Sequence, residues 1–190
     1  YDHRNDLSKL AKLVALRSAA FKDVVELERS TLSERSRKLF TLSAIYSANA
    51  ALLEGAEFAD VDQAATRCVV YWDEIAKCLP EWGFVRASRM TAGEVRRDFI
   101  HSHAIVLQAL GIAGNALLRS NPTDWKVLLS RLRDLDWSRS NAKLWEGRAM
   151  IGGRVSKASQ NVTLTTNAIK QRLGLELGPE EQRAEKAFRR

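Results

Sequence analysis

Apolar residues recur along most of this chain at intervals of three and four, the spacing that places them on one face of an α-helix. The pattern is clearest in the ranges 7–14, 61–79 and 100–118. We find no convincing alternation of apolar and polar residues of the kind that marks a half-buried strand. The pattern therefore predicts an all-α fold, a single multi-helix domain of about seven to nine helices.

Capping residues predict where several of these helices begin. Thr31 and Thr91 each stand three residues before a glutamate, in the capping-box arrangement, and Asp60 precedes another apolar stripe. We therefore expect helices that open directly after these three residues. The first helix is expected to continue its apolar face from Leu7 to about Leu27.

Proline and glycine predict further boundaries. Pro80 should end the helix that follows Asp60, which leaves residues 81–84 as a loop. Pro122 should occupy the first position of a later helix, and Asn161 or Thr163 should cap another that runs to about Leu173. Beyond it, residues 173–190 are expected to hold a C-terminal helix.

Two glycines lie inside the long apolar run 100–118. Gly111 and Gly114 suggest that a neighbouring helix approaches closely there. A kink or break in the helix is the alternative.

The composition fits a helical protein with a sizeable core. The 190 residues are 45% hydrophobic and 28% charged, with 3 prolines and 10 glycines. No stretch approaches the roughly 18–20 apolar residues that a membrane span needs, so we expect no membrane partner. Cys68 and Cys78 form neither a disulfide framework nor a metal-ligand pattern, and we expect both to be buried in a cytoplasmic protein.

The positive charge is concentrated in one part of the chain. Residues 1–118 hold 15 basic and 15 acidic side chains, and residues 173–190 hold 4 of each. Residues 119–172, the basic segment, hold 11 basic side chains against 4 acidic ones, so the whole net charge of +7 falls there. A local excess of cations indicates a local anionic partner, although it can also be a solvated face.

We interpret the basic segment as a contact with double-stranded DNA, because lysine and arginine neutralise phosphates. Residues 161–171 have the size and polar content of a recognition helix, and the backbone amides of Gly152 and Gly153 could approach phosphates closely. The interleaved tryptophans at 125, 137 and 145 are expected to be packing residues. The predicted DNA-contacting residues are Arg131, Arg133, Arg139, Lys143, Arg148, Arg154, Lys157, Thr165, Asn167, Lys170, Gln171 and Arg172.

Enzymatic signatures are missing from the sequence. It contains no GxxxxGK[ST] phosphate loop, GxGxxG, HExxH or nucleophile elbow. His101 and His103 point in different directions on a helix, so we expect one core and one surface histidine. Arg96 and Arg97 are flanked by acids and are expected to pair locally. We therefore expect neither catalysis nor a bound metal or cofactor.

Four stretches, in this order along the chain, resemble the DndB family of DNA sulfur (phosphorothioate) modification-associated proteins. They are YDHRND at 1–6, EVRRDFIHSH at 94–103, DWSRSN at 136–141 with WEG at 145–147, and TLTTNAIKQRLGL at 163–175. The DGQHR motif of that family is absent, which leads us to expect that this chain is the C-terminal helical portion of a longer protein.

The resemblance implies a transcriptional regulator that binds the promoter DNA of phosphorothioation genes and is therefore nucleoid-associated. The basic segment would supply phosphate contacts. The alternative is a module for dimerisation, or for docking onto phosphorothioation proteins, that does not itself bind DNA.

Overall fold

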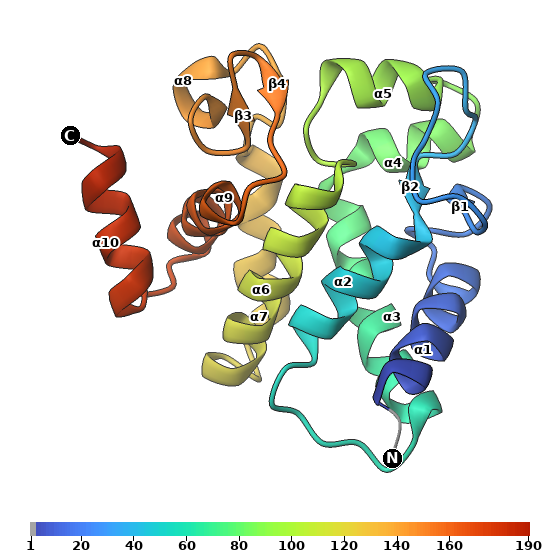
Figure 1. Ribbon diagram of the computed structural model, residues 1–190. Helices are drawn as coiled ribbons and strands as arrows, with labels where there is room; N and C mark the ends of the chain where they lie inside the picture. Colours follow the sequence, from blue (N-terminus) through green and yellow to red (C-terminus); the bar gives the residue numbers. More distant parts are fainter. Residues whose placement is uncertain (1–2) are drawn as a thin grey trace.

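Within residues 3–190, which the computed structural model of the protein describes, the chain forms ten α-helices and one 3-10 helix (Figure 1). The all-α prediction is confirmed, with slightly more helices than expected. Strand structure is limited to two pairs of two-residue strands in this part of the chain. The first two residues of the YDHRND stretch lie outside the described residues. The helices are α1 (His3–Arg17), α2 (Leu42–Leu52), α3 (Val61–Cys78), α4 (Pro80–Arg86), α5 (Ala92–Asp98), α6 (Ala104–Ser120), α7 (Trp125–Leu129), η1 (Ser130–Asp134), α8 (Ala142–Trp145), α9 (Ser159–Leu173) and α10 (Pro179–Phe188).

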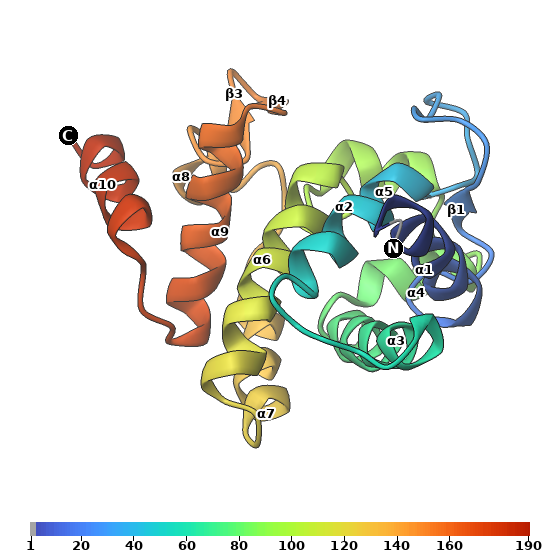
Figure 2. The ribbon, with the colours of Figure 1, turned by 60° about the horizontal axis from the view of Figure 1, so that its bottom comes forward.

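Helix α6 lies at the centre of the molecule, with α2 on one side and α9 on the other (Figures 1 and 2). Helices α1 and α3 pack beyond α2, and α10 lies against the outer side of α9. Ten of the residues of α6 are buried, which its nearly continuous apolar sequence requires. The close approach predicted from the glycines of α6 is confirmed, because a Cβ on Gly111 would overlap the backbone of Ala48 and one on Gly114 would overlap Tyr71.

An aromatic cluster fills the core between α3, α4 and the segment before α2. The ring of Phe40 meets Phe21 edge-on at 5.1 Å and Trp82 edge-on at 4.8 Å. Trp72, fully buried in α3, donates its indole N–H to Asn49 Oδ1 at 2.7 Å. The indole of Trp72 thus buries its ring and satisfies its N–H together, whereas the buried indole nitrogen of Trp82 has no hydrogen-bond partner among the described residues.

The prediction of helix is wrong for residues 18–27 and for residues 32–41. Helix α1 ends at Arg17, where the carboxylate of Asp73 accepts hydrogen bonds from the Ser18 hydroxyl and the Ala19 amide. The chain then turns back, and β1 (Val25–Glu26) pairs in parallel with β2 (Phe40–Thr41). No helix opens after Thr31; instead Thr41 caps α2 by accepting from the Ala44 amide.

Other boundary predictions had mixed outcomes. Asp60 and Thr91 cap α3 and α5 as predicted, and α10 begins at Pro179. Residues 81–84 are part of α4 and not a loop, because Pro80 starts a new helix as well as ending the previous one. Pro122 lies before α7, which begins at Trp125, and α9 follows Ala158 and not Asn161 or Thr163.

Within the described residues, no helix combines the length and the apolar character that a membrane crossing requires.

Candidate nucleic-acid interface

Two of the stretches that carry the family resemblance meet in the structure. The amide of Ile100 donates to the carbonyl of Trp137 at 3.0 Å, and the amide of Arg139 donates to the carbonyl of Asp98 at 2.9 Å. Phe99 and Ser138 form an isolated antiparallel bridge between these bonds. The end of α5 and the loop 136–141 are therefore one structural unit, although about forty residues separate them in sequence.

Two tryptophans fix the loop 136–141 to the core. Trp137 and Trp145 stack with their ring centroids 5.3 Å apart and an interplanar angle of 16°. Trp145 is fully buried and donates its indole N–H to the carbonyl of Asp136 at 2.7 Å. Trp125 is buried as well. The prediction that these three are packing residues is confirmed, and none of them offers an exposed ring for base stacking.

Arg96 fastens the loop before α2 onto α5. Its guanidinium donates to the carbonyls of Ser33 at 3.0 Å and Ser36 at 3.2 Å, and it also contacts the carbonyls of Glu34 and Lys38. Partial burial lowers the pKa of this guanidinium, which nevertheless stays cationic. The predicted local pairing of Arg96 is wrong, whereas Arg97 does pair with Asp98 at 3.2 Å.

The C-terminal carbonyls of α5 receive side-chain donors. His103 Nε2 lies 2.8 Å from the carbonyl oxygen of Arg96 and must donate to it. Arg139 Nη1 donates to the carbonyl of Arg97 at 3.2 Å. Burial lowers the pKa of His103, and the neighbouring guanidinium groups lower it further, so the ring is neutral at pH 7.

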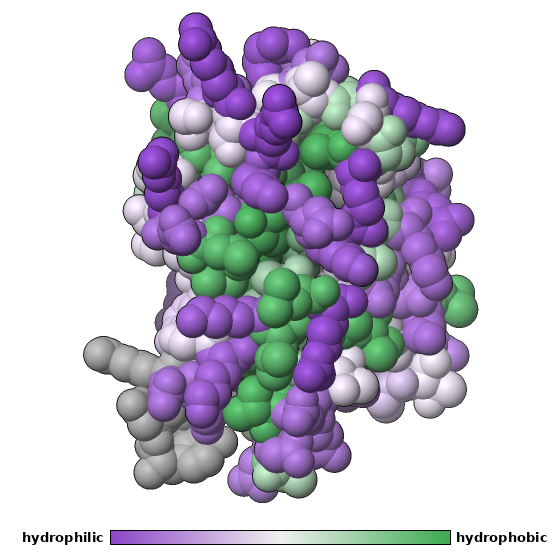
Figure 3. All heavy atoms as spheres, turned by 90° about the vertical axis from the view of Figure 1, so that its right-hand side faces the viewer, coloured by the Kyte–Doolittle hydropathy of each residue, from purple (hydrophilic) through white to green (hydrophobic). Residues whose placement is uncertain are grey.

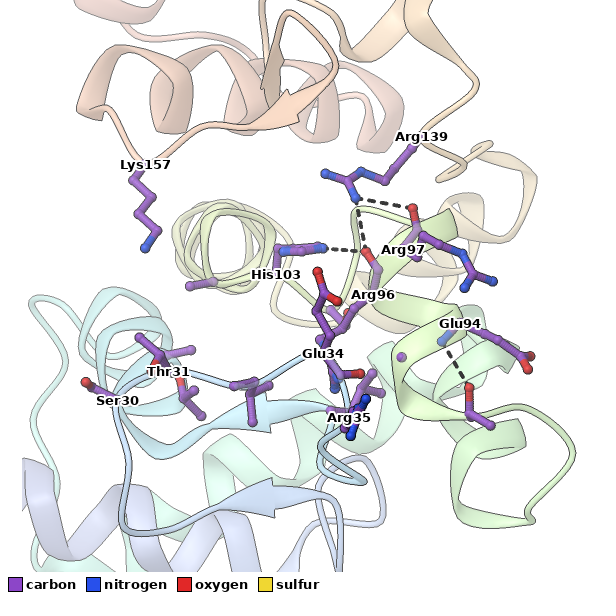
Figure 4. A pocket seen from close by; sticks show the side chains of 18 residues that line it. Ser30, Thr31, Glu34, Arg35, Glu94, Arg96, Arg97, His103, Arg139 and Lys157 are labelled. Atoms are coloured by element: carbon purple, nitrogen blue, oxygen red, sulfur yellow. Dashed lines mark hydrogen bonds between the residues drawn. The ribbon is translucent and has the colours of Figure 1, made fainter.

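These elements surround an open cleft of about 920 Å³ (Figure 4). The loop before α2 forms one wall, α5 and the start of α6 form another, and Lys157 extends from the segment before α9. The cleft is lined by five basic side chains and two acidic ones. They are Arg35, Arg96, Arg97, Arg139 and Lys157, with Glu34 and Glu94.

The basic side chains that line the cleft differ in whether they are free to bind a ligand. Arg96 and Arg139 are held by backbone carbonyls. Arg35 and Lys157 are exposed and form no ion pair with any residue in the described part of the chain. Strands β3 (Met150–Ile151) and β4 (Arg154–Val155) and helix α8, which carries Lys143, lie at the same end of the molecule as α5 (Figure 1).

Four of the predicted DNA-contacting residues are buried beneath other elements. Asn167 and Thr165 are fully buried, and Arg148 and Lys170 are 6% and 8% exposed. Arg148 forms a two-pronged ion pair with Glu185, and Lys170 binds Glu181 at 2.8 Å. Contrary to the prediction, these four side chains are not open to a ligand in the conformation described, because α10 and the core cover them.

A second group of predicted residues caps the far end of α9. Arg131 Nη1 donates to the carbonyl of Leu173 at 3.2 Å, and Arg172 Nε donates to the carbonyl of Arg131 at 3.1 Å. Lys157 precedes the N-terminal end of α9. By helical rise, that end lies on the order of 20 Å from the C-terminal end that Arg131 caps. The basic segment therefore does not form one continuous surface. Contacts of DNA with Arg133, Arg139, Lys143, Arg154, Lys157 and Gln171 stay predictions.

The backbone amides of Gly152 and Gly153 are already occupied. Both glycines have positive φ and form the two-residue turn between β3 and β4. Their amides donate to the two carboxylate oxygens of Glu146. The expectation that these amides bind a phosphate backbone is therefore wrong for this conformation.

His101, Cys68 and Cys78 are buried titratable groups that do not line the cleft, whereas His103 is one of its lining residues. His101 is fully buried with its Nε2 3.1 Å from Glu81, and burial lowers its pKa despite this carboxylate. His103 is half-buried and not a surface residue as predicted. Cys68 and Cys78 are buried free thiols, as expected, and burial raises the pKa of Cys68 to about 12. Among residues 3–190, no group of three His, Cys, Asp or Glu side chains is placed to hold a metal ion.

Comparison with known proteins decides the family. The DndB profile, described as DNA-sulfur modification-associated, matches residues 1–176 of this chain. The chain belongs to the DndB family. Searches of curated proteins and of solved structures gave no significant match. The match spans the cleft and all of α9, and it ends before α10 begins.

Proposed function

We propose that this DndB family member contacts DNA as part of a transcriptional regulator of DNA phosphorothioation genes. The observation that supports this role is the cleft that five basic side chains from four segments of the chain line. Phosphate groups supply most of the sequence-independent affinity of proteins for DNA, and a groove lined by cations raises their local concentration. The partner would be double-stranded promoter DNA in the nucleoid.

The residues that line the cleft differ from the DNA-contacting residues that the charge distribution along the sequence predicted. Lys157 and Arg139 come from the basic segment, whereas Arg35 and Arg97 come from the part of the chain that carries no net charge. Of these, Lys157 and Arg35 would bind phosphates directly because neither is engaged by another side chain. Arg139 would contribute its charge while it holds α5.

Removing the two available cations tests the proposal. Titration of duplex DNA at several salt concentrations should give weaker binding for Arg35→Gln with Lys157→Gln, and a slope of log K against log salt that is shallower by about two. Lys9→Gln with Lys12→Gln removes the same charge from exposed positions on α1 and should leave the slope unchanged. Equal slopes for the wild type and the cleft variant would contradict the assignment, and nucleotide turnover by this chain would contradict a purely binding role.

A dimerisation or docking module is the second candidate, and the apolar surface on another side of the molecule supports it. Leu16 in α1 and Leu27 after β1 are 61% and 51% exposed. The side of the molecule that carries α1 and β1 shows apolar surface between hydrophilic side chains (Figure 3). Light scattering separates the two candidates, because a stable dimer that ignores DNA would favour the module.

A further inference from the structure

We propose that the face of α9 beneath α10 is a second phosphate-binding surface for nucleic acid, and that α10 masks it with two carboxylates. In the closed state described here, Glu181 and Glu185 would occupy the positions that phosphates take when α10 is displaced. This inference rests on the proposed function in one respect, because both assume that the ligand is a nucleic-acid backbone. Its residues are separate from the cleft.

The carboxylate of Glu185 is held in the manner of a bound phosphate. Both terminal nitrogens of Arg148 donate to it, in the paired geometry that guanidinium groups use for carboxylates and phosphates alike. The amide of the Asn167 side chain donates to it at 3.3 Å and Arg189 Nε at 3.0 Å. A buried anion that receives this many donors marks a site built for negative charge.

A second carboxylate, that of Glu181, faces α9 as well, and it also accepts from the amide of Gly178 at the start of α10 at 2.9 Å. Lys170 Nζ lies 2.8 Å from Glu181 Oε1, and the side-chain amide of Asn167 also donates to the carbonyl of Glu181 at 3.0 Å. Lys170 and Asn167 are one helical turn apart on α9, so they face α10 together. With Arg148, they form a row of donors that a nucleic-acid backbone could follow.

The buried contacts of α10 are ionic, and the one aromatic contact of this helix is half-buried. Glu185 is the only buried residue of α10, so no apolar side chain of this helix is buried. Phe188, its one aromatic residue, is half-buried, with the Arg148 guanidinium 4.4 Å from its ring centroid. Because buried ion pairs add little net stability and respond to competing ions, an anionic ligand can displace such a helix.

Two further observations agree with a displaceable cover. The side-chain oxygen of Asn167 is buried without a hydrogen-bond partner among the described residues, so α10 leaves part of this polar face unsatisfied. Helix α10 lies at the edge of the molecule against α9, joined to it by residues 174–178 (Figure 2). Gly174, at φ +78°, ends α9 and begins this connection.

The proposal is tested in the full chain by removing the two carboxylates that hold α10 against α9. Glu181→Gln with Glu185→Gln should accelerate hydrogen exchange of the α10 amides and tighten binding of a short DNA duplex by about fivefold to tenfold, with a salt slope steeper by about two. Glu176→Gln with Glu180→Gln removes the same charge from exposed neighbouring residues and should change affinity by less than about twofold. Adding Arg148→Gln and Lys170→Gln to the opened variant should abolish the gain.

A measurement on the unmodified chain guards against misfolding of the variant. Saturating duplex DNA should speed hydrogen exchange of the α10 amides, because ligand and helix compete for the same cations. Unchanged protection of α10 in the DNA complex would overturn the proposal, as would an opened variant that binds with wild-type affinity and slope. The cleft is tested separately, since Arg35→Gln with Lys157→Gln leaves α10 in place.

Discussion

The guanidinium of Arg96 sets the position of the loop before α2. It donates to carbonyls at four positions of that loop, and a helix over the same residues would use those carbonyls internally. The side chain thus supplies donors to carbonyls that the loop itself leaves largely unpaired, although the carbonyl of Ser33 also accepts from the amide of Ser36 at 3.1 Å. Because Arg35 lies in this loop, Arg96 also positions one wall of the cleft.

Replacing Arg96 by alanine is expected to destabilise the protein by about 2–3 kcal/mol, because the loop loses a charged donor to four carbonyls, those of Ser36 and Lys38 in partly buried positions. Arg96→Lys should not restore stability, since an ammonium group cannot span the carbonyls that a guanidinium reaches. Urea unfolding measures both effects. Arg97→Ala, at an exposed neighbouring position, should change the free energy of unfolding by no more than about 0.5 kcal/mol, and an equal loss there would contradict the assignment.

The buried histidines should make stability depend on pH. Burial lowers the pKa of both His101 and His103 from the ordinary value of 6.5. Below that pH the unfolded chain takes up protons that the folded chain does not, so the free energy of unfolding should fall as the pH falls from 6.5. Each histidine contributes a slope of up to about 1.4 kcal/mol per pH unit.

Thermal melts between pH 7.5 and pH 5 check this, with His103→Gln as the comparison. That variant should show a shallower fall than the wild type. A melting temperature that is independent of pH over this window would show that neither ring is held neutral by the fold.

At the scale of the elements, the contact of α2 with α6 depends on one missing side chain. Gly111 allows the backbone of α6 to approach Ala48 in α2, so the two helices pack more closely than side chains would permit. The glycines within the apolar run suggested such a close approach, since glycine in a helix costs stability unless packing requires it, but the sequence left a kink as the alternative and did not identify the partner helix.

Gly111→Ala is expected to cost about 1–3 kcal/mol, because the new methyl group would push α2 and α6 apart. Gly83 offers a matched control, since it also lies within a helix and a Cβ there meets no atom within 4 Å. Gly83→Ala should be neutral or stabilising by up to about 1 kcal/mol. Equal effects of the two substitutions on the urea midpoint would contradict the packing argument.

At the scale of the whole molecule, charges that are adjacent in sequence separate in space. Cations of the basic segment line the cleft, lie beneath α10 or cap the far end of α9. The cleft in turn combines them with cations from the near-neutral part of the chain. Its electrostatic character is therefore a property of the tertiary structure, and two carboxylates reduce its positive field.

Neutralising one of these carboxylates should strengthen DNA binding. Glu34→Gln removes a negative charge from the cleft wall and is expected to tighten duplex binding by about twofold to fivefold at low salt, an effect that should shrink as salt increases. Anisotropy titrations measure it. Glu57→Gln, at an exposed position between α2 and α3, should leave affinity unchanged, and an equal gain there would indicate a response to net charge alone.

The sequence by itself determined the features that depend on neighbouring residues. Periodicity predicted the all-α class, Asp60 and Thr91 predicted two helix starts, and the buried cysteines followed from composition. Each rests on interactions within a few residues, which the order of amino acids specifies directly. The family resemblance, too, came from short stretches and is confirmed over residues 1–176.

Only the tertiary structure decided which polar residues are available. Thr31 has the local form of a helix cap, but Arg96, more than sixty residues later, takes the carbonyls that a helix would need. Asn167 and Lys170 have the polar character of a DNA-reading face, but α10 covers them. Burial and ion pairing depend on residues distant in the chain, so a count of charges cannot separate a cation that binds a ligand from one that binds the protein.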